Sequence, residues 1–247
     1  MNKFIIALFA ILSIQFLGAA RDPMRLTHGP MLGNPTSDSV RVWGRTSDPG
    51  EFSVRYGTVE GKLDQISEPT TTSISNDNTG YAILRNLKPD QTYHYQIHIK
   101  DRPHGLPGSF LTLPNAEYTR NAEHNPKGLF NFRFQIGSCA NQNPIHGNGH
   151  RAKTYENLNR DWAHKTNFHI MNGDWLYEEL REYPVEAWRL RAGIDALPPV
   201  VNLMPTVVGV WENYKLYLSR GISLSQWHRN VPSFFTFDDH ELVNDIW

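Results

Sequence analysis

The stretch NLKPDQTYHYQIHI, residues 86–99, decides the fold of the first half of this chain. Its second part alternates aromatic or aliphatic residues with polar ones, which is typical of a strand with one buried face. A Leu-x-Pro turn precedes Tyr93 near the start of this strand. That arrangement predicts a tyrosine corner, in which the tyrosine hydroxyl ties the strand to the turn before it. The stretch therefore predicts one strand of an antiparallel sandwich.

Similar short strands surround this stretch from Arg25 to Pro114. They are rich in Val, Ile, Thr and Tyr, they recur about every ten residues, and turn signals such as Asp-Pro-Gly separate them. Such a series predicts a β-sandwich that resembles fibronectin type III modules, and we assign it to residues 21–116.

The periodicity changes after a polar segment, 117–130, which we interpret as a linker. From residue 131 to residue 247, strand patterns alternate with helical ones, which indicates an α/β layer with partly parallel strands. The chain is therefore expected to be a mixed α+β protein with two domains.

Residues 1–20, MNKFIIALFAILSIQFLGAA, have the layout of a secretory signal peptide. Lys3 supplies a positive charge, a short apolar run follows, and Gly18, Ala19 and Ala20 form a small-residue cleavage site. An uncleaved N-terminal anchor is the alternative. We expect a secreted or periplasmic protein with no membrane span after signal cleavage.

Composition excludes several classes of protein. The formal net charge is −1, so there is no basic excess that would indicate a nucleic-acid-binding patch. The chain has one cysteine, Cys139, which excludes an internal disulfide framework. Aromatic residues make up 12% of the chain, and this predicts a packed core.

Three predicted strands end in residues that can bind metals: Cys139, Asp174 and Asp239. Ligands of α/β sheets lie at the carboxyl ends of strands, so neighbouring strands would bring these side chains together. Gly137 and Gly173 would allow the backbone to turn tightly there. Clustered acids repel one another unless a cation lies between them, which favours a dinuclear metal site.

Each of these motifs alone has an ordinary structural explanation. Gly-Asp after a strand is commonly a turn, Asp-Asp-His-Glu commonly begins a helix, and a single buried cysteine is commonly inert. Their combination on three successive strand ends is what favours a metal site.

These residues stand in three segments: IGSCANQ around Cys139, NGDWLYEE around Asp174 and Tyr177, and FFTFDDHELVND around Asp239 and His240. The three segments resemble those of the PhoD-type alkaline phosphatases, a branch of the metallophosphoesterase superfamily. The segment THGPMLGNPTSDSVRVWGR resembles that family's N-terminal sandwich domain. The resemblance implies that the sandwich is followed by the start of a metallophosphoesterase catalytic domain.

The resemblance also implies a centre that holds Fe³⁺ and Ca²⁺. Cys139 would bind iron as a thiolate and Tyr177 as a phenolate. Asp174 would bridge the two metals, and Asp239 would contact the second metal or the phosphate. His240 would hydrogen-bond the phosphate or protonate the leaving oxygen.

Further side chains near these motifs are candidates for supporting contacts: Asp238, Glu241 and Asn244. Glu178 and Glu179, which follow Tyr177, are expected to point to solvent.

The resulting expectation is a secreted, metal-dependent phosphatase. It would hydrolyse phosphate monoesters, with diesters as a second class, through attack by a metal-activated hydroxide or oxide. Its partner would be a small phosphate ester or a phosphodiester polymer. Because the family continues well beyond the position of Trp247, we expect a C-terminally truncated catalytic domain with weakened metal binding. The alternative function is an inactive form that acts only as an extracytoplasmic binding module through its β-sandwich.

Overall fold

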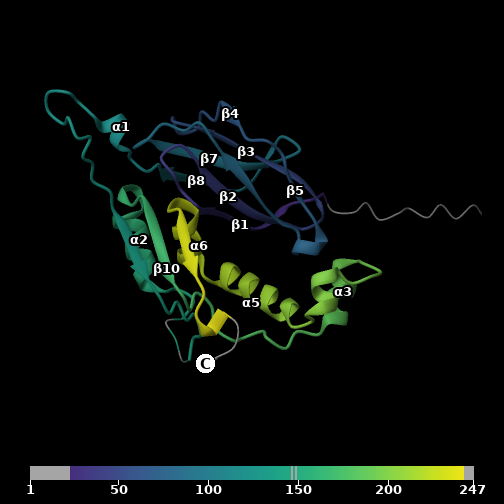
Figure 1. The fold of residues 1–247 in the computed structure, drawn as a ribbon. Coiled ribbons are helices and arrows are strands. Elements are labelled where there is room, and N and C mark those ends of the chain that lie inside the picture. The colour runs from purple at the N-terminus through teal and green to yellow at the C-terminus, as the bar shows by residue number, and fades with distance from the viewer. Residues whose placement is uncertain (1–22, 146, 148, 242–247) are drawn as a thin grey trace, which may run out of the picture.

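The protein is a mixed α/β chain with two β-sheets (Figure 1). The computed structural model describes residues 23–145, 147 and 149–241. The predicted signal peptide and Asn244 lie outside the described residues. Within the described part, no helix is both long enough and apolar enough to cross a membrane.

The first half of the chain forms two antiparallel layers. One layer contains β1 (Leu26–Gly33), β2 (Val40–Thr46) and β6 (Thr79–Leu84). The other contains β3 (Gly50–Gly57), β4 (Gln65–Ile66), β5 (Thr70–Thr72), β7 (Thr92–Ile99) and β8 (Arg102–Leu111). Alternate residues of these strands point into a shared apolar core that includes Val42, Phe52 and Ile97.

The predicted tie at Tyr93 is confirmed, since the Lys88 backbone N–H donates to its hydroxyl at 2.9 Å. Its ring packs against Phe110 in the core, with the ring centroids 5.8 Å apart. The tie fixes the entry of β7 into the sheet. The specific likeness to fibronectin type III modules stays a prediction.

The second half contributes three parallel strands: β9 (Phe134–Gly137), β10 (Phe168–Asn172) and β11 (Ser233–Thr236). The prediction of parallel strands is therefore confirmed. Several helices lie before and between them: α1 (Ala116–Thr119), α2 (Lys153–Asp161), α3 (Val185–Ala192), α4 (Pro199–Leu203), α5 (Val207–Arg220) and α6 (Ile222–Asn230). The short helices α1 and α4 were not expected, because neither spans enough residues to show a helical period.

The two halves share one sheet, which the sequence did not indicate. Its six strands follow the order β6-β2-β1-β11-β10-β9, and β1 meets β11 through the pairing of Gly33 with Ser233. Helix α6 strengthens the junction, because the Tyr95 hydroxyl donates to the carbonyl of Arg229 at 2.7 Å. The polar segment 117–130 therefore lies between two stretches of sequence that meet again in one sheet.

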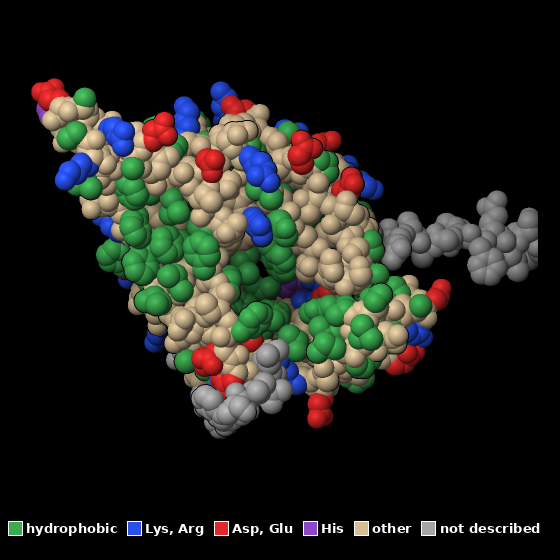
Figure 2. Space-filling view, in the orientation of Figure 1, with side chains coloured by type: hydrophobic (Ala, Val, Ile, Leu, Met, Phe, Trp, Pro, Cys, Tyr) green, Lys and Arg blue, Asp and Glu red, His purple; other side chains and the backbone are tan. Residues whose placement is uncertain are grey.

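The strands β9, β10 and β11 have two different faces. Helices α2 and α6 cover one face, where His169 and Met171 are buried. The opposite face carries a row of phenylalanines: Phe134 stacks on Phe168 at 5.4 Å, and Phe168 meets Phe234 edge-on at 5.8 Å. Figure 2 shows hydrophobic side chains gathered over this part of the molecule. Exposed apolar side chains therefore cover this face of the described parallel strands.

Candidate metal centre

The carboxyl ends of β9, β10 and β11 lie at the same edge of the sheet, and the loops that follow them meet there. Two backbone bonds join the first two loops: Cys139 N–H donates to the carbonyl of Gly173 at 3.4 Å, and Ala140 N–H donates to that of Asp174 at 2.8 Å. Cys139 and Asp174 both have left-handed backbones, with φ of +56° and +54°. Residues other than glycine rarely adopt this conformation, so neighbouring contacts must hold these two residues in place.

Gly173 allows the second and third loops to approach each other. Its φ is +80°, and a Cβ at this position would lie 2.4 Å from the Cβ of Asp238. Any larger residue would push the loop after β10 away from the loop after β11. Gly137, which was expected to play the same part, has only ordinary contacts around a Cβ at its position, the nearest at 3.5 Å. That expectation was wrong for Gly137.

Asp174 is the centre of a small cluster of side chains of types that can bind metals. Its Oδ2 accepts hydrogen bonds from the Cys139 thiol and from the Tyr177 hydroxyl, each at 3.3 Å. Its Oδ1 is buried and has no hydrogen-bond partner among the described residues. A buried carboxylate oxygen without a donor is costly, and a cation at that oxygen would remove the cost. The donor set therefore fits a metal ion.

The environment of Tyr177 keeps its hydroxyl protonated when no cation is near. Burial raises the pKa of Tyr177 most strongly, and hydrogen bonds with Cys139 and Asp174 raise it further. A metal ion beside the oxygen would act in the opposite direction, because it favours the deprotonated form. A ligand role for Tyr177 would therefore require an ion close enough to favour the phenolate.

The third loop brings Asp239 and His240 to this cluster through a 3-10 helix, Asp239–Glu241. Potential ligand atoms of Asp174, Asp239 and His240 all lie within 4.8 Å of one another. The ring of His240 also lies against that of Tyr177, with centroids 3.9 Å apart. All five principal residues singled out in the sequence therefore meet at one edge of the sheet.

Glu178 is exposed, as expected, but its carboxylate also reaches His240. Its two carboxylate oxygens lie 3.0 and 2.9 Å from Nδ1 of His240. Burial lowers the pKa of His240, but the bond to Glu178 and the nearby carboxylates outweigh this effect and raise it. Glu179 is largely shielded from solvent and pairs with Arg220, so the expectation was wrong for this residue. Sequence reasoning missed both partners because each lies dozens of residues away.

Glu241 is buried and holds the backbone of two loops. Its Oε2 accepts the N–H groups of Asp174 at 3.0 Å and Asp238 at 2.8 Å, and its Oε1 accepts that of Trp175 at 2.5 Å. Asp238 in turn accepts the N–H of Asp239 at 2.9 Å. Both residues were supporting candidates, and the contacts observed for them are made with the backbone.

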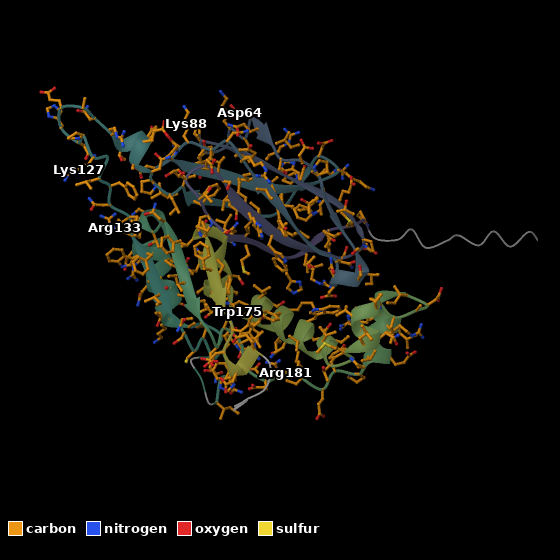
Figure 3. All side chains as sticks on the ribbon, viewed as in Figure 1. Asp64, Lys88, Lys127, Arg133, Trp175 and Arg181 are labelled. Atoms are coloured by element: carbon orange, nitrogen blue, oxygen red, sulfur yellow. The ribbon has the colours of Figure 1, made fainter. Side chains whose placement is uncertain are left out.

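Arg181 also supports the centre, and no pattern in the sequence indicated it. It donates to the backbone carbonyls of Glu241, at 2.9 Å, and His240. Figure 3 labels Arg181 and Trp175 on the ribbon around this region. Because the guanidinium binds the carbonyls of the 3-10 helix, it fixes the turn that carries two of the candidate ligands.

Comparison with known families identifies both halves of the chain. A family model described as "PhoD-like phosphatase, N-terminal domain" matches residues 13–114, and one described as "PhoD-like phosphatase" matches residues 134–247. No curated protein matches the chain.

Among solved structures, one titled "Structure of PhoD" is similar, with 20% identity and a TM-score of 0.62. The match covers 87% of this chain and 39% of that one, so this chain spans well under half the length of its structural relative. The sensor domain of the anti-sigma factor RsgI4 of Pseudobacteroides cellulosolvens matches with 16% identity, covering 39% of this chain and all of that domain, at a TM-score of 0.31. Together the two family models span most of the sequence. The chain belongs to the PhoD-like phosphatase family.

Proposed function

We propose that this chain carries part of the active centre of an extracytoplasmic, metal-dependent phosphatase. The observation that carries the proposal is the buried Oδ1 of Asp174, which has no hydrogen-bond partner in the described residues and lies within a cluster of ligand atoms from Asp239 and His240. Membership of a phosphatase family supports the reaction class, and the cluster supports this edge of the sheet as the place where the reaction would occur.

The ligand types favour one hard, highly charged cation and one calcium ion. Cys139, Tyr177 and Asp174 would hold Fe³⁺, since a thiolate and a phenolate are anionic donors that such an ion stabilises. Asp174 and Asp239 would supply the carboxylate oxygens that Ca²⁺ prefers. When bound, the two ions would supply the positive charge that binds phosphate oxygens and activates water.

His240 is the residue suited to move a proton. Glu178 occupies its Nδ1, so Nε2 is the nitrogen that can give a proton to a leaving oxygen. The raised pKa of His240 keeps more of the ring protonated near neutral pH than an ordinary histidine would be. Glu178 would therefore orient the His240 ring and favour its protonated form.

The substrates that follow from this chemistry are phosphate monoesters and diesters, either small esters or a phosphodiester polymer. The apolar run and small-residue site of residues 1–20 support export of the chain. Export would place the enzyme where extracellular phosphate esters are available.

The test is metal binding and ester hydrolysis by the purified chain after addition of Fe³⁺ and Ca²⁺. Metal content is measured by elemental analysis, and hydrolysis with p-nitrophenyl phosphate and bis-p-nitrophenyl phosphate. Cys139→Ala should lose iron and most activity with an unchanged circular dichroism spectrum, whereas Ser138→Ala, at the exposed neighbouring position, should keep both. Full iron content in Cys139→Ala would remove the thiolate from the ligand set. Bound metal without hydrolysis would favour the alternative function as a binding module.

A further inference from the structure

A buried chain of hydrogen bonds starts beside the metal centre and ends at the junction of the two halves. The indole N–H of Trp175 donates to Nε2 of His228 at 3.0 Å, and Nδ1 of His228 lies 2.7 Å from Oγ of Ser233. The Ser233 hydroxyl donates to the carbonyl of Val231 at 3.0 Å. All four residues are buried. Neither His228 nor Ser233 lies in the motifs that carry the candidate metal ligands.

The protons in this series of hydrogen bonds have only one consistent arrangement. An indole N–H only donates, so Nε2 of His228 must accept. The Ser233 hydroxyl uses its single proton on Val231, so its oxygen must accept from Nδ1–H of His228. His228 is thus a neutral imidazole of one tautomer. Burial, with a smaller effect of nearby His169, lowers the pKa of His228 well below its ordinary value, which preserves this state.

Trp175 connects this series of hydrogen bonds to Asp174, the candidate ligand that precedes it in the sequence. The backbone N–H of Trp175 is held by Glu241 at 2.5 Å, and its ring stacks on Tyr214 with centroids 5.5 Å apart. With its side chain bound to His228 and its backbone bound to Glu241, Trp175 has little freedom to rotate. The left-handed Asp174 immediately before it is therefore fixed as well.

The far end of this hydrogen-bond series lies where β11 pairs with β1, at the junction of the two halves of the protein. Ser233 pairs with Gly33 of β1 on one side and with His169 of β10 on the other. The loop that carries Asp174 is thus tied, through two side chains, to the strand that joins the sandwich to the parallel strands.

We infer that His228 and Ser233 are positioning residues for the metal centre, which hold the Asp174 loop through the indole of Trp175. This inference rests on the metal centre proposed above, but its effect on the loop does not depend on bound metal. Partners that orient metal ligands from behind commonly change metal affinity about 10- to 100-fold when they are removed.

The structure offers a matched control pair in the same buried layer. The indole N–H of Trp227 donates to Nδ1 of His169 at 2.8 Å, so the donor and acceptor types are those of Trp175 and His228. Trp227 is fully buried in α6, and its backbone N–H is not held by Glu241. Removing this second bond costs the core a similar hydrogen bond without releasing the Asp174 loop.

The experiment compares four variants of the whole chain: Trp175→Phe, His228→Leu, His228→Gln and Trp227→Phe. Iron and calcium affinities are measured by competition with chelators, and the exchange of backbone hydrogens in residues 172–178 is measured by mass spectrometry without metal. We expect Trp175→Phe and His228→Leu to weaken metal binding about tenfold and to speed exchange in this segment. His228→Gln, whose amide can both accept and donate, should recover part of each effect.

Trp227→Phe should lose stability as the other variants do but keep metal affinity within about twofold and the exchange of residues 172–178 unchanged. Equal effects of Trp227→Phe and Trp175→Phe on both measurements would overturn the inference, because the network would then be only a part of the core. If the unaltered chain binds no metal, the proposed metal centre is wrong. In that case the hydrogen exchange of residues 172–178 alone tests the positioning role. Unchanged exchange of this segment in Trp175→Phe would overturn it.

Discussion

The carboxylate of Glu241 accepts the backbone N–H of Asp174 at 3.0 Å, across 67 residues of sequence. The same carboxylate also binds the backbone of Trp175 and Asp238, so one side chain joins the loop after β10 to the loop after β11. The geometry of the candidate metal centre is thus set as much by this acceptor as by the ligands.

Replacing Glu241 with Gln should destabilise the protein and weaken metal binding. The amide keeps the size of the side chain but offers one oxygen in place of two, so at least one buried N–H loses its partner, at a cost of about 1–3 kcal/mol. Urea unfolding would measure the loss. Glu182→Gln, at an exposed position nearby, should change little. An unfolding free energy equal to that of the original chain would contradict the role of Glu241.

Gly173→Ala should disturb the centre more than a similar change at Gly193. Both glycines have left-handed backbones, with φ of +80° and +65°, so alanine costs about 1–2 kcal/mol at either position. At Gly173 the new Cβ would also lie 2.4 Å from the Cβ of Asp238, whereas at Gly193 it would meet no atom of the described residues within 4 Å.

The difference in unfolding free energy between these two variants measures the close approach of the loops. We expect Gly173→Ala to be the less stable and to bind metal more weakly. Equal stabilities and unchanged metal binding would show that the loops can separate without consequence.

Stability should fall as the pH decreases from 6.5 toward 4, because of the buried histidines. Burial lowers the pKa of His169 to about 4, so the unfolded chain takes up its proton at a higher pH than the folded chain does. The stability from this group is complete above pH 6.5 and is lost as the pH falls to about 4, a loss of roughly 2 kcal/mol between pH 7 and 4.5. His28, with its pKa also lowered to about 4 by burial and by Arg45 and Lys215, adds to this effect.

Urea unfolding at pH 7 and 4.5 would measure this dependence. His169→Gln, which keeps an acceptor for the Trp227 indole, should lose less stability between the two pH values than the original chain. If both proteins lose the same unfolding free energy between pH 7 and 4.5, His169 is not the source of the pH dependence.

The phenylalanine row on the outer face of the parallel strands should bind apolar probes. Phe134 is 52% exposed and stacks on Phe168, so Phe134→Ser removes apolar surface at little cost to the core. We expect weaker fluorescence enhancement of anilinonaphthalene sulfonate and less self-association in light scattering. Tyr118→Ser, which removes another exposed aromatic ring away from this row, is the control. Equal dye binding by both variants would show that the row is not a distinct surface.

The sequence predicted the strands and their ends because these depend on local patterns. Alternation identified β7, apolar runs identified β10 and β11, and the acids that follow such runs identified Asp174 and Asp239. Parallel pairing then brought the three ends to one edge of the sheet, as the general behaviour of α/β sheets implies.

The remaining features depend on partners far apart in the chain. Nothing near Glu178 in the sequence indicates His240, which lies 62 residues later, and nothing near Trp175 indicates His228, which lies 53 residues later. The pairing of β1 with β11 rests on one residue from each strand, Gly33 and Ser233, too short a contact to leave a pattern. Such features follow from the way the elements pack in three dimensions.

The pairing of Gly33 with Ser233 limits where this chain can be cut without exposing a strand edge. A gene deletion or fusion that moved the first 116 residues as a unit would cut at a polar segment, where domain exchange is usually harmless. Here it would also remove the neighbour of β11 and leave a strand edge of the candidate phosphatase bare. The parallel strands separated from the N-terminal strands should therefore associate edge to edge more readily than the whole chain does.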